Sequence, residues 1–141
     1  MKLNGRTTQR IVIAFVFAMV ALAAVPQLQA HRQRERLTDG VSALARYAAD
    51  MERFYLANGR YGNNADSGCG VRPPANTEFL SFSCRTEGDS YIVTLRGVSA
   101  LEGYEYVLDA STQPRKTVRF AGAEVHANCW LSSESSCFTR G

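Results

Sequence analysis

The chain has 141 residues, of which 21% are charged, and a formal net charge of +3 at pH 7. This length corresponds to one domain with room for an appendage. The basic residues are spread along the sequence and form no dense stripe with aromatic platforms, so the composition does not indicate a nucleic-acid-binding domain.

The N-terminal segment contains an uncharged apolar run over residues 11–25. Basic residues stand on both sides of it: Lys2, Arg6, Arg10, Arg32, Arg34 and Arg36. A helix of this length rises about 22 Å, which falls short of the ~30 Å hydrocarbon core of a bilayer. The run is therefore a weak candidate for an independent transmembrane span. A secretory signal peptide is a stronger one, because small residues at 21–23 and 28–30 offer cleavage sites.

A third interpretation follows from the next segment, where apolar residues recur in steps of four and three: Leu37, Val41, Leu44, Ala48, Met51 and Tyr55. This spacing predicts one face of an amphipathic helix. Pro26 kinks a helix more often than it ends one, and Asn58-Gly59 is a C-terminal signal. The sequence thus predicts one long, bent helix, first apolar all round and then apolar on one face. Five residues are predicted to pack this helix on a sheet: Leu37, Val41, Leu44, Met51 and Tyr55.

The remainder of the chain predicts a loop and then short strands. Residues 59–76 are rich in Gly, Asn and Pro, which is typical of a loop. Strand-like runs follow at 77–84, 90–97, 103–110 and 115–122, with links short enough for antiparallel neighbours. A long N-terminal helix packed on a sheet of three or four antiparallel strands, over 77–122, is an α+β fold. A C-terminal disulfide loop, 123–141, completes it.

Four cysteines, Cys69, Cys84, Cys129 and Cys137, accompany the hydrophobic N-terminus. An even number in this setting indicates an oxidising compartment and two disulfides. Their spacings of 15, 45 and 8 residues lack the close pairs of a metal site. Three pairings are possible. We prefer the two local pairs, Cys69 with Cys84 and Cys129 with Cys137, because they close small loops, although the sequence does not decide the connectivity.

No set of residues predicts catalysis, a metal site or a cofactor. No serine stands in a G-x-S-x-G turn, and the glycines at 68 and 70 lack the lysine and the following helix of a phosphate-binding loop. His31 and His126 are expected to be solvated or strand residues. The single tryptophan, Trp130, is either a core residue beside a disulfide or an exposed contact residue. We therefore predict a non-enzymatic protein.

The order of these parts resembles that of the type IV pilins, especially the minor pilins of Gram-negative bacteria. The most specific segment is ALARYAADMERFYLANGRYG at 43–62, and CGVRPP at 69–74, LSFSC at 80–84 and the terminal Cys-Trp with its second cysteine also fit. The resemblance implies a minor structural subunit of a type IV pilus or pseudopilus that supports filament assembly, adhesion or motility. The alternative is a secreted or inner-membrane-anchored periplasmic binding domain with a conventional signal peptide.

The resemblance also implies a division of the chain. A leader, 1–5, would be cleaved after Gly5, so that a methylated mature chain starts at Arg6. An apolar stalk helix, 6–30, would lie in the membrane, and a head, 31–141, would carry the helix over 31–58. The implied partners are other pilin subunits, an inner-membrane assembly platform and a prepilin peptidase, with no specific nucleic acid. The implied location is the inner membrane with a periplasmic head before assembly, and the pilus at the cell surface afterwards.

The opening stretch departs from the family pattern. Family leaders end in Gly followed by Phe-Thr-Leu-Ile-Glu, whereas Gly5 is followed by Arg-Thr-Thr-Gln-Arg. The family's stalk Glu falls on Arg10 when counted from Gly5, and on Gln9 when counted back from Pro26. Three hypotheses follow: a minor pilin at a filament tip or in an initiation complex, an unprocessed pilin-like protein that stays in the membrane, or a diverged head that is exported by another route.

Overall fold

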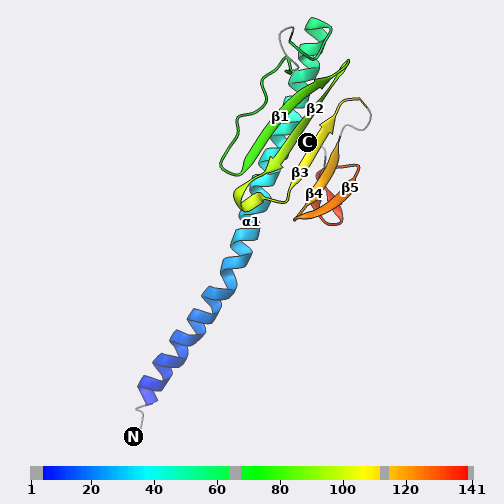
Figure 1. Cartoon of the computed structure of the whole chain (residues 1–141). Helices are drawn as coiled ribbons and strands as arrows, with labels where there is room; N and C mark the ends of the chain where they lie inside the picture. Colours follow the sequence, from blue (N-terminus) through cyan, green and yellow to red (C-terminus); the bar gives the residue numbers. More distant parts are fainter. Residues whose placement is uncertain (1–4, 64–67, 112–114, 140–141) are drawn as a thin grey trace. The chain divides into compact units, whose positions relative to one another are not determined.

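The computed structural model describes residues 5–63, 68–111 and 115–139. The chain divides into two compact units, Met1–Arg34 and Glu35–Gly141. Its elements are one long helix, a five-stranded antiparallel sheet and a C-terminal loop closed by a disulfide (Figure 1). This arrangement confirms the predicted α+β fold class.

The helix α1 spans Gly5–Asn58 and passes through Pro26 without ending. It ends where Gly59 adopts a left-handed φ of 70°, a conformation that a residue without a Cβ atom reaches at little cost. The amide of Gly59 donates a hydrogen bond to the carbonyl of Tyr55 at 2.7 Å. This bond satisfies one of the carbonyl groups that the last helical turn leaves open.

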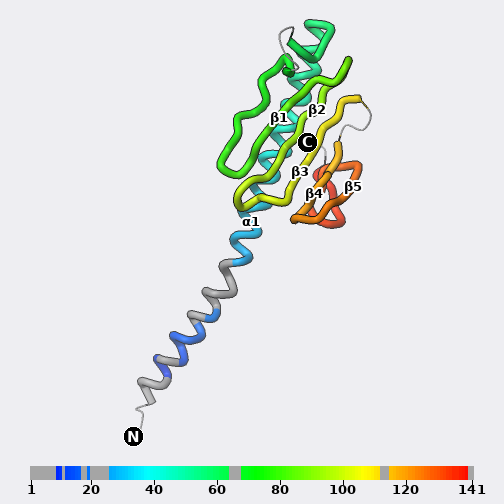
Figure 2. The backbone as a smooth tube through the Cα atoms, viewed as in Figure 1, coloured from blue at the N-terminus to red at the C-terminus, as the bar shows by residue number. Residues whose placement is uncertain are grey.

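Within the unit Glu35–Gly141, five strands form a meander in the order β1-β2-β3-β4-β5, each antiparallel to the next (Figure 2). The strands are β1 Leu80–Glu87, β2 Ser90–Gly97, β3 Glu105–Asp109, β4 Lys116–Phe120 and β5 Ala123–Ala127. A 3-10 turn, η1 Ser99–Leu101, lies between β2 and β3, and β6 Leu131–Ser133 pairs with β7 Ser136–Cys137 in a second, two-stranded sheet.

The sheet has one strand more than the three or four expected, because β5 occupies part of the segment expected to be a loop. Most β5 residues are exposed, so the apolar alternation that marks a half-buried strand is missing. The turn Ala121-Gly122 joins β4 to β5 with φ angles of 50° and 85°, both positive as a type I′ hairpin requires. Alanine rarely adopts this conformation, so the turn carries no familiar hairpin signal in the sequence.

The hydrophobic core lies between the sheet and the part of α1 that crosses one of its faces (Figure 1). Most of the fully buried side chains come from α1, β2 and β3, and they include Leu44, Met51, Val93, Leu95 and Tyr106. Alternate residues of β2 face the helix, as the pleat of a strand dictates. The core therefore belongs to the unit Glu35–Gly141.

Gly40 sets the distance between α1 and the sheet. A Cβ atom at this position would lie 2.7 Å from Cδ1 of Leu80 and 3.1 Å from Cδ2 of Leu95. The lack of a side chain thus lets the helix backbone approach β1 and β2 closely. Glycine is less favourable than alanine within a helix by about 1 kcal/mol, and this close packing explains its presence at position 40.

Candidate interaction surfaces

Four of the five residues predicted to pack on the sheet lie in the core: Leu37, Val41, Leu44 and Met51. The fifth, Tyr55, is 38% exposed. Its ring stacks on Tyr61, with 4.5 Å between the ring centroids. The loop that follows the helix therefore provides the packing partner of Tyr55.

Tyr47 is a buried α1 residue that the sequence analysis missed. Its hydroxyl donates to the carbonyl of Val71 at 2.8 Å, which ties the helix to the segment before β1. Burial raises the pKa of Tyr47 to about 12, because the ionised form would be poorly solvated. Tyr47 follows Leu44 by three residues, so the helical spacing that identified its neighbours was a usable signal.

Three tyrosines form an aromatic ladder at the C-terminal end of α1. Tyr61 lies between Tyr55 and Tyr91, with ring centroids 4.5 Å and 4.9 Å away. The hydroxyl of Tyr61 donates to the carboxylate of Glu52, 3.0 Å and 3.1 Å from its two oxygens. Burial and this hydrogen bond raise the pKa of Tyr61, so its hydroxyl stays protonated and holds the loop on the helix.

Two exposed arginines, Arg60 and Arg72, lie on the antiparallel segments beside this ladder. The segments are joined by the bridge between Gly62 and Cys69 and by a hydrogen bond of 2.6 Å from the amide of Gly70 to the carbonyl of Tyr61. Within the described residues, neither arginine forms an ion pair. Two arginines that have no ion-pair partner among the described residues therefore lie close to a partly exposed aromatic stack.

The cysteines are joined in the two local pairs. Cys69–Cys84 attaches the loop after α1 to β1, and Cys129–Cys137 closes the C-terminal loop. The Cα atoms are 6.0 Å apart in both pairs, a usual separation for a disulfide. Each bond therefore fixes a segment that has little regular structure of its own.

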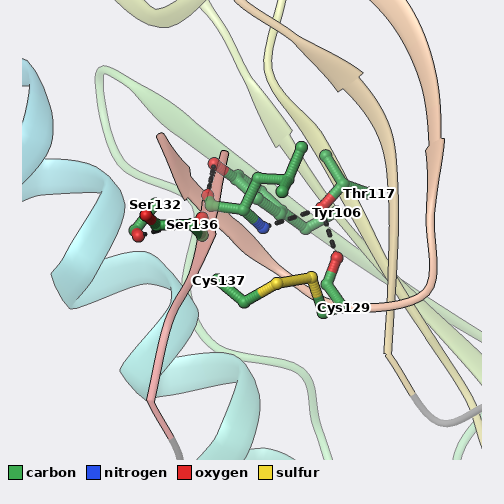
Figure 3. Close-up of a disulfide and its surroundings, with 7 residues drawn as sticks. Tyr106, Thr117, Cys129, Ser132, Ser136 and Cys137 are labelled. Carbon is green, nitrogen blue, oxygen red and sulfur yellow. Dashed lines mark hydrogen bonds between the residues drawn. A yellow bond between two sulfur atoms is a disulfide. The ribbon is translucent and has the colours of Figure 1, made fainter. Parts of the chain in front are cut away.

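Thr117 attaches the C-terminal loop to the sheet (Figure 3). It is 1% exposed, and its hydroxyl donates to the carbonyl of Cys129 at 2.6 Å and accepts the amide of Leu131 at 2.9 Å. The carbonyl of Leu131 accepts a further hydrogen bond, at 3.0 Å, from the buried hydroxyl of Tyr106. One hydroxyl group thus satisfies two backbone groups of the loop at once.

Trp130 is the core residue of this loop. It is 2% exposed, and its Nε1 donates to the carbonyl of Val107 at 3.0 Å. The guanidinium group of Arg115 lies over its ring, 4.8 Å from the centroid. Of the two roles that the sequence left open for this tryptophan, the structure supports the core residue.

Two cavities lie beside the loop. One, of about 740 Å³, is lined by residues that include Glu52, Tyr91 and Leu108. The other, of about 480 Å³, lies between α1 and the loop. Arg115, Trp130 and Phe138 line both. In the described part of the chain, no group of His, Cys, Asp and Glu side chains could hold a metal ion.

Charge is unevenly distributed along the chain. The unit Glu35–Gly141 carries eleven Lys and Arg residues and thirteen Asp and Glu residues, a formal net charge of −2. Residues 1–34 carry five Lys and Arg residues and no acidic residue. Several basic groups of the sheet are also ion-paired, such as Arg96 with Glu105 at 3.2 Å. The excess positive charge therefore belongs to the N-terminal segment.

The residues predicted to be processed lie at the start of α1, with Gly5 as its first residue and Arg6 as its second. The leader positions 1–4 fall outside the described residues. Gln9 and Arg10, the two positions assigned to the family's stalk Glu, are both exposed. No helical stretch of the described residues combines the length and the apolar character that crossing a membrane requires.

The family with the description "Type IV minor pilin ComP, DNA uptake sequence receptor" matches residues 26–129. No individually curated protein and no solved structure shows a significant match to the chain. The match extends from the proline within α1 through all five strands of the sheet to the first cysteine of the C-terminal disulfide. Pilin families consist of structural subunits that interact with other pilin subunits. Because the match covers well over half of the sequence, this chain belongs to the type IV minor pilin family.

Proposed function

We propose that this protein is a minor structural subunit that supports type IV pilus assembly, held in the inner membrane before assembly and packed in the filament through residues 6–30 afterwards. The observation that carries the proposal is a set of apolar side chains in the first unit that are 49–72% exposed: Val12, Ile13, Phe15, Val16 and Met19. Burying such side chains is worth about 1.5–3 kcal/mol each. Lipid, and later the helices of other subunits, would cover them.

The charges around this segment support a membrane stage. Basic residues stand at both ends of the apolar run, and acidic residues are absent from residues 1–34. Lys and Arg near anionic lipid headgroups contribute about 1 kcal/mol each to membrane association. Cleavage between Gly5 and Arg6 by a prepilin peptidase, recruitment by an assembly platform, and a role in adhesion or motility belong to the same proposal.

The test combines intact-mass measurement with analysis of sheared filaments. We expect a mature chain that starts at Arg6 and is present in the filaments. Ile13→Asp and Phe15→Asp should remove the protein from filaments, whereas Leu56→Asp, at an exposed apolar position of the other unit, should not. A mature chain that starts near residue 25 or 31, or filament incorporation that survives both N-terminal substitutions, would contradict the proposal.

A second candidate function is DNA binding, because the matching family is described as a receptor for a DNA uptake sequence. The aromatic ladder favours it, because Arg60 and Arg72, which form no ion pair with the described residues, lie beside a partly exposed tyrosine stack. Cations beside aromatic rings are a common arrangement in nucleic-acid-binding surfaces. The net charge of −2 on the unit Glu35–Gly141 opposes general attraction to DNA, so binding would depend on these few residues.

Fluorescence anisotropy with a labelled DNA duplex, at several salt concentrations, tests this second function. We expect Arg60→Gln and Arg72→Gln each to weaken binding. Each should also reduce, by about one, the slope of the logarithm of the binding constant against the logarithm of the salt concentration. Arg85→Gln is the matched control, because Arg85 is exposed but lies near Glu87, at 4.0 Å. Equal effects of all three substitutions would indicate diffuse attraction and count against a site at the ladder.

A further inference from the structure

The cavity between α1 and the C-terminal loop is built from two kinds of wall. One wall is α1, where small side chains such as Ala45 and Ala49 leave space beside Val41. The other wall is formed by Trp130 and Phe138. The cavity measures about 480 Å³, a volume that accommodates a few side chains of a ligand. It lies wholly within the unit Glu35–Gly141.

The wall formed by the loop is held in place. The indole nitrogen of Trp130 donates to Val107 at 3.0 Å, and the amide of Phe138 donates to the carbonyl of Trp130 at 2.7 Å. The disulfide Cys129–Cys137 fixes the two ends of the segment between them. A ligand would therefore meet a pre-formed cavity, which lowers the entropy lost on binding.

Two arginines line this cavity, and neither forms an ion pair within the described residues. Arg46 is exposed, and Arg115 lies over the ring of Trp130. Nearby carboxylates are already engaged: Asp50 pairs with Arg53 at 2.9 Å, and Glu52 accepts hydrogen bonds from Tyr61. The cavity therefore combines apolar side chains with two arginines that have no ion-pair partner among the described residues.

We propose that this cavity binds an acidic peptide segment of a partner protein, with a carboxylate between Arg46 and Arg115 and an adjacent apolar side chain against Trp130 and Phe138. Guanidinium groups bind carboxylates through paired, charge-assisted hydrogen bonds. The wall formed by Trp130 and Phe138 favours a carboxylate that is next to a hydrophobic residue over an isolated anion. This proposal does not depend on the DNA-binding candidate, which uses Arg60 and Arg72.

A nucleic acid fits this cavity less well. Its phosphates recur along a long strand and are matched by an extended basic stripe. Arg46 and Arg115 instead line one cavity, and Glu52 lines the neighbouring cavity that shares Arg115. The unit's net charge of −2 also disfavours a polyanion more than a short peptide with one or two charges.

The experiment uses the fluorescence of Trp130, the only tryptophan of the chain, in the full-length protein in detergent. The probe is the synthetic peptide acetyl-Gly-Phe-Glu-Leu-Gly-amide, compared with the same peptide carrying Gln in place of Glu. We expect a saturable change in fluorescence with the Glu peptide and a Kd at least about tenfold higher for the Gln peptide, because hydrogen bonds to a neutral amide are weaker than those to a carboxylate.

Arg46→Gln and Arg115→Gln should each weaken binding of the Glu peptide by about tenfold. Arg53→Gln, on the same helix but paired with Asp50, should leave the Kd unchanged. Because Arg115 stacks on the fluorophore, amide chemical shifts of Ala49 and Thr139 provide a second readout for that variant.

Three outcomes would overturn the proposal. The first is the absence of a saturable change at up to about 10 mM Glu peptide, far above the Kd of a specific site. The second is equal affinity for the Glu and Gln peptides. The third is a single-stranded oligonucleotide that binds more tightly than the peptide and needs the same two arginines, since this result would assign the cavity to nucleic acid.

Discussion

Gly40 and Gly97 are positions where a missing side chain determines how neighbouring elements pack. A Cβ atom on Gly40 would meet the movable end of the Leu80 side chain, whereas one on Gly97 would collide with the backbone carbonyl group of Leu101. A side chain can shift to relieve such a contact, but a backbone held by η1 cannot do so cheaply. The two glycines should therefore differ in tolerance to the same substitution.

We predict that Gly97→Ala destabilises the protein by more than about 3 kcal/mol, or prevents folding. Gly40→Ala should destabilise it by only ~0–2 kcal/mol, because improved helix propensity offsets part of the overpacking. Urea unfolding followed by Trp130 fluorescence measures both, with Ser83→Ala at an exposed β1 position as the control. A larger loss for Gly40→Ala than for Gly97→Ala would contradict the packing argument.

Asp109 links stability to acidic pH. The hydroxyl and amide of Ser111 donate to its carboxylate at 2.6 Å and 2.9 Å, and Lys116 lies 3.6 Å away. The Ser111 hydroxyl hydrogen bond is the largest cause that lowers the pKa of Asp109. Because the folded pKa is below the unfolded one, this contribution is complete above about pH 4 and is lost as the pH falls through the folded pKa.

We therefore expect Asp109→Asn to be less stable than the wild type at pH 7, with a difference that shrinks as the pH falls below about 4. Unfolding midpoints at three pH values measure this change. Ser111→Ala should likewise make the stability of the protein less dependent on acidic pH. A difference between Asp109→Asn and wild type that stays constant with pH would exclude the proposed linkage.

At the scale of elements, Thr117 tests how the sheet holds the C-terminal loop. Thr117→Val keeps the shape of the side chain but leaves the carbonyl of Cys129 and the amide of Leu131 without their partner. Each buried unsatisfied group costs about 1–3 kcal/mol. We expect a loss of about 2–4 kcal/mol for this substitution and a much smaller loss for Thr117→Ser, which retains the hydroxyl. Equal losses for Val and Ser would show that the hydroxyl is unimportant.

The two disulfides should contribute unequally. A larger loop restricts the unfolded chain more, so Cys69–Cys84, with a separation of 15 residues, has the larger expected effect. Chain-entropy arguments give about 3 kcal/mol for it and about 2.5 kcal/mol for Cys129–Cys137. Paired Cys→Ser variants, compared in urea unfolding, measure the two values. Four free thiols in protein recovered from the periplasm would contradict both.

The elements that could be predicted from the sequence are those in which apolar residues recur at a regular spacing. Helical spacing identified Leu37, Val41, Leu44 and Met51 as buried residues of α1 but not Tyr47, and strand-like runs identified four strands. Tyr55 follows the same spacing but meets Tyr61, which lies between it and Tyr91 on the sheet. β5 is an exposed edge strand, so burial left no alternation in its sequence.

The cavity beside the C-terminal loop had no counterpart in the sequence. It arises where small side chains of α1 face Trp130 and Phe138, residues that are distant in the chain. A gap of this kind depends on three-dimensional packing, which residue spacing does not encode. The ion-pairing state of Arg46 and Arg115 depends on the same packing. The site was therefore recognisable only once α1, Arg115 and the C-terminal loop were placed together.

At the scale of the whole molecule, the two units differ in what surrounds them. The unit Glu35–Gly141 contains the core and both disulfides, whereas the described part of the first unit exposes apolar side chains. We predict that residues 31–141 alone are soluble and unfold cooperatively, while the full chain requires detergent or associates. Sedimentation and thermal unfolding of the two forms measure this difference. Aggregation of the 31–141 fragment under non-reducing conditions would contradict it.

The turn Gly88-Asp89 between β1 and β2 offers a place for a label. Both residues are exposed, and no atom lies within 4 Å of a Cβ position on Gly88. Eight cross-strand pairs fix the register of the hairpin, so the turn itself is not needed to set it. A short epitope inserted here would add little loop-closure entropy. An antibody against it would then count the copies of this subunit that are accessible on intact cells.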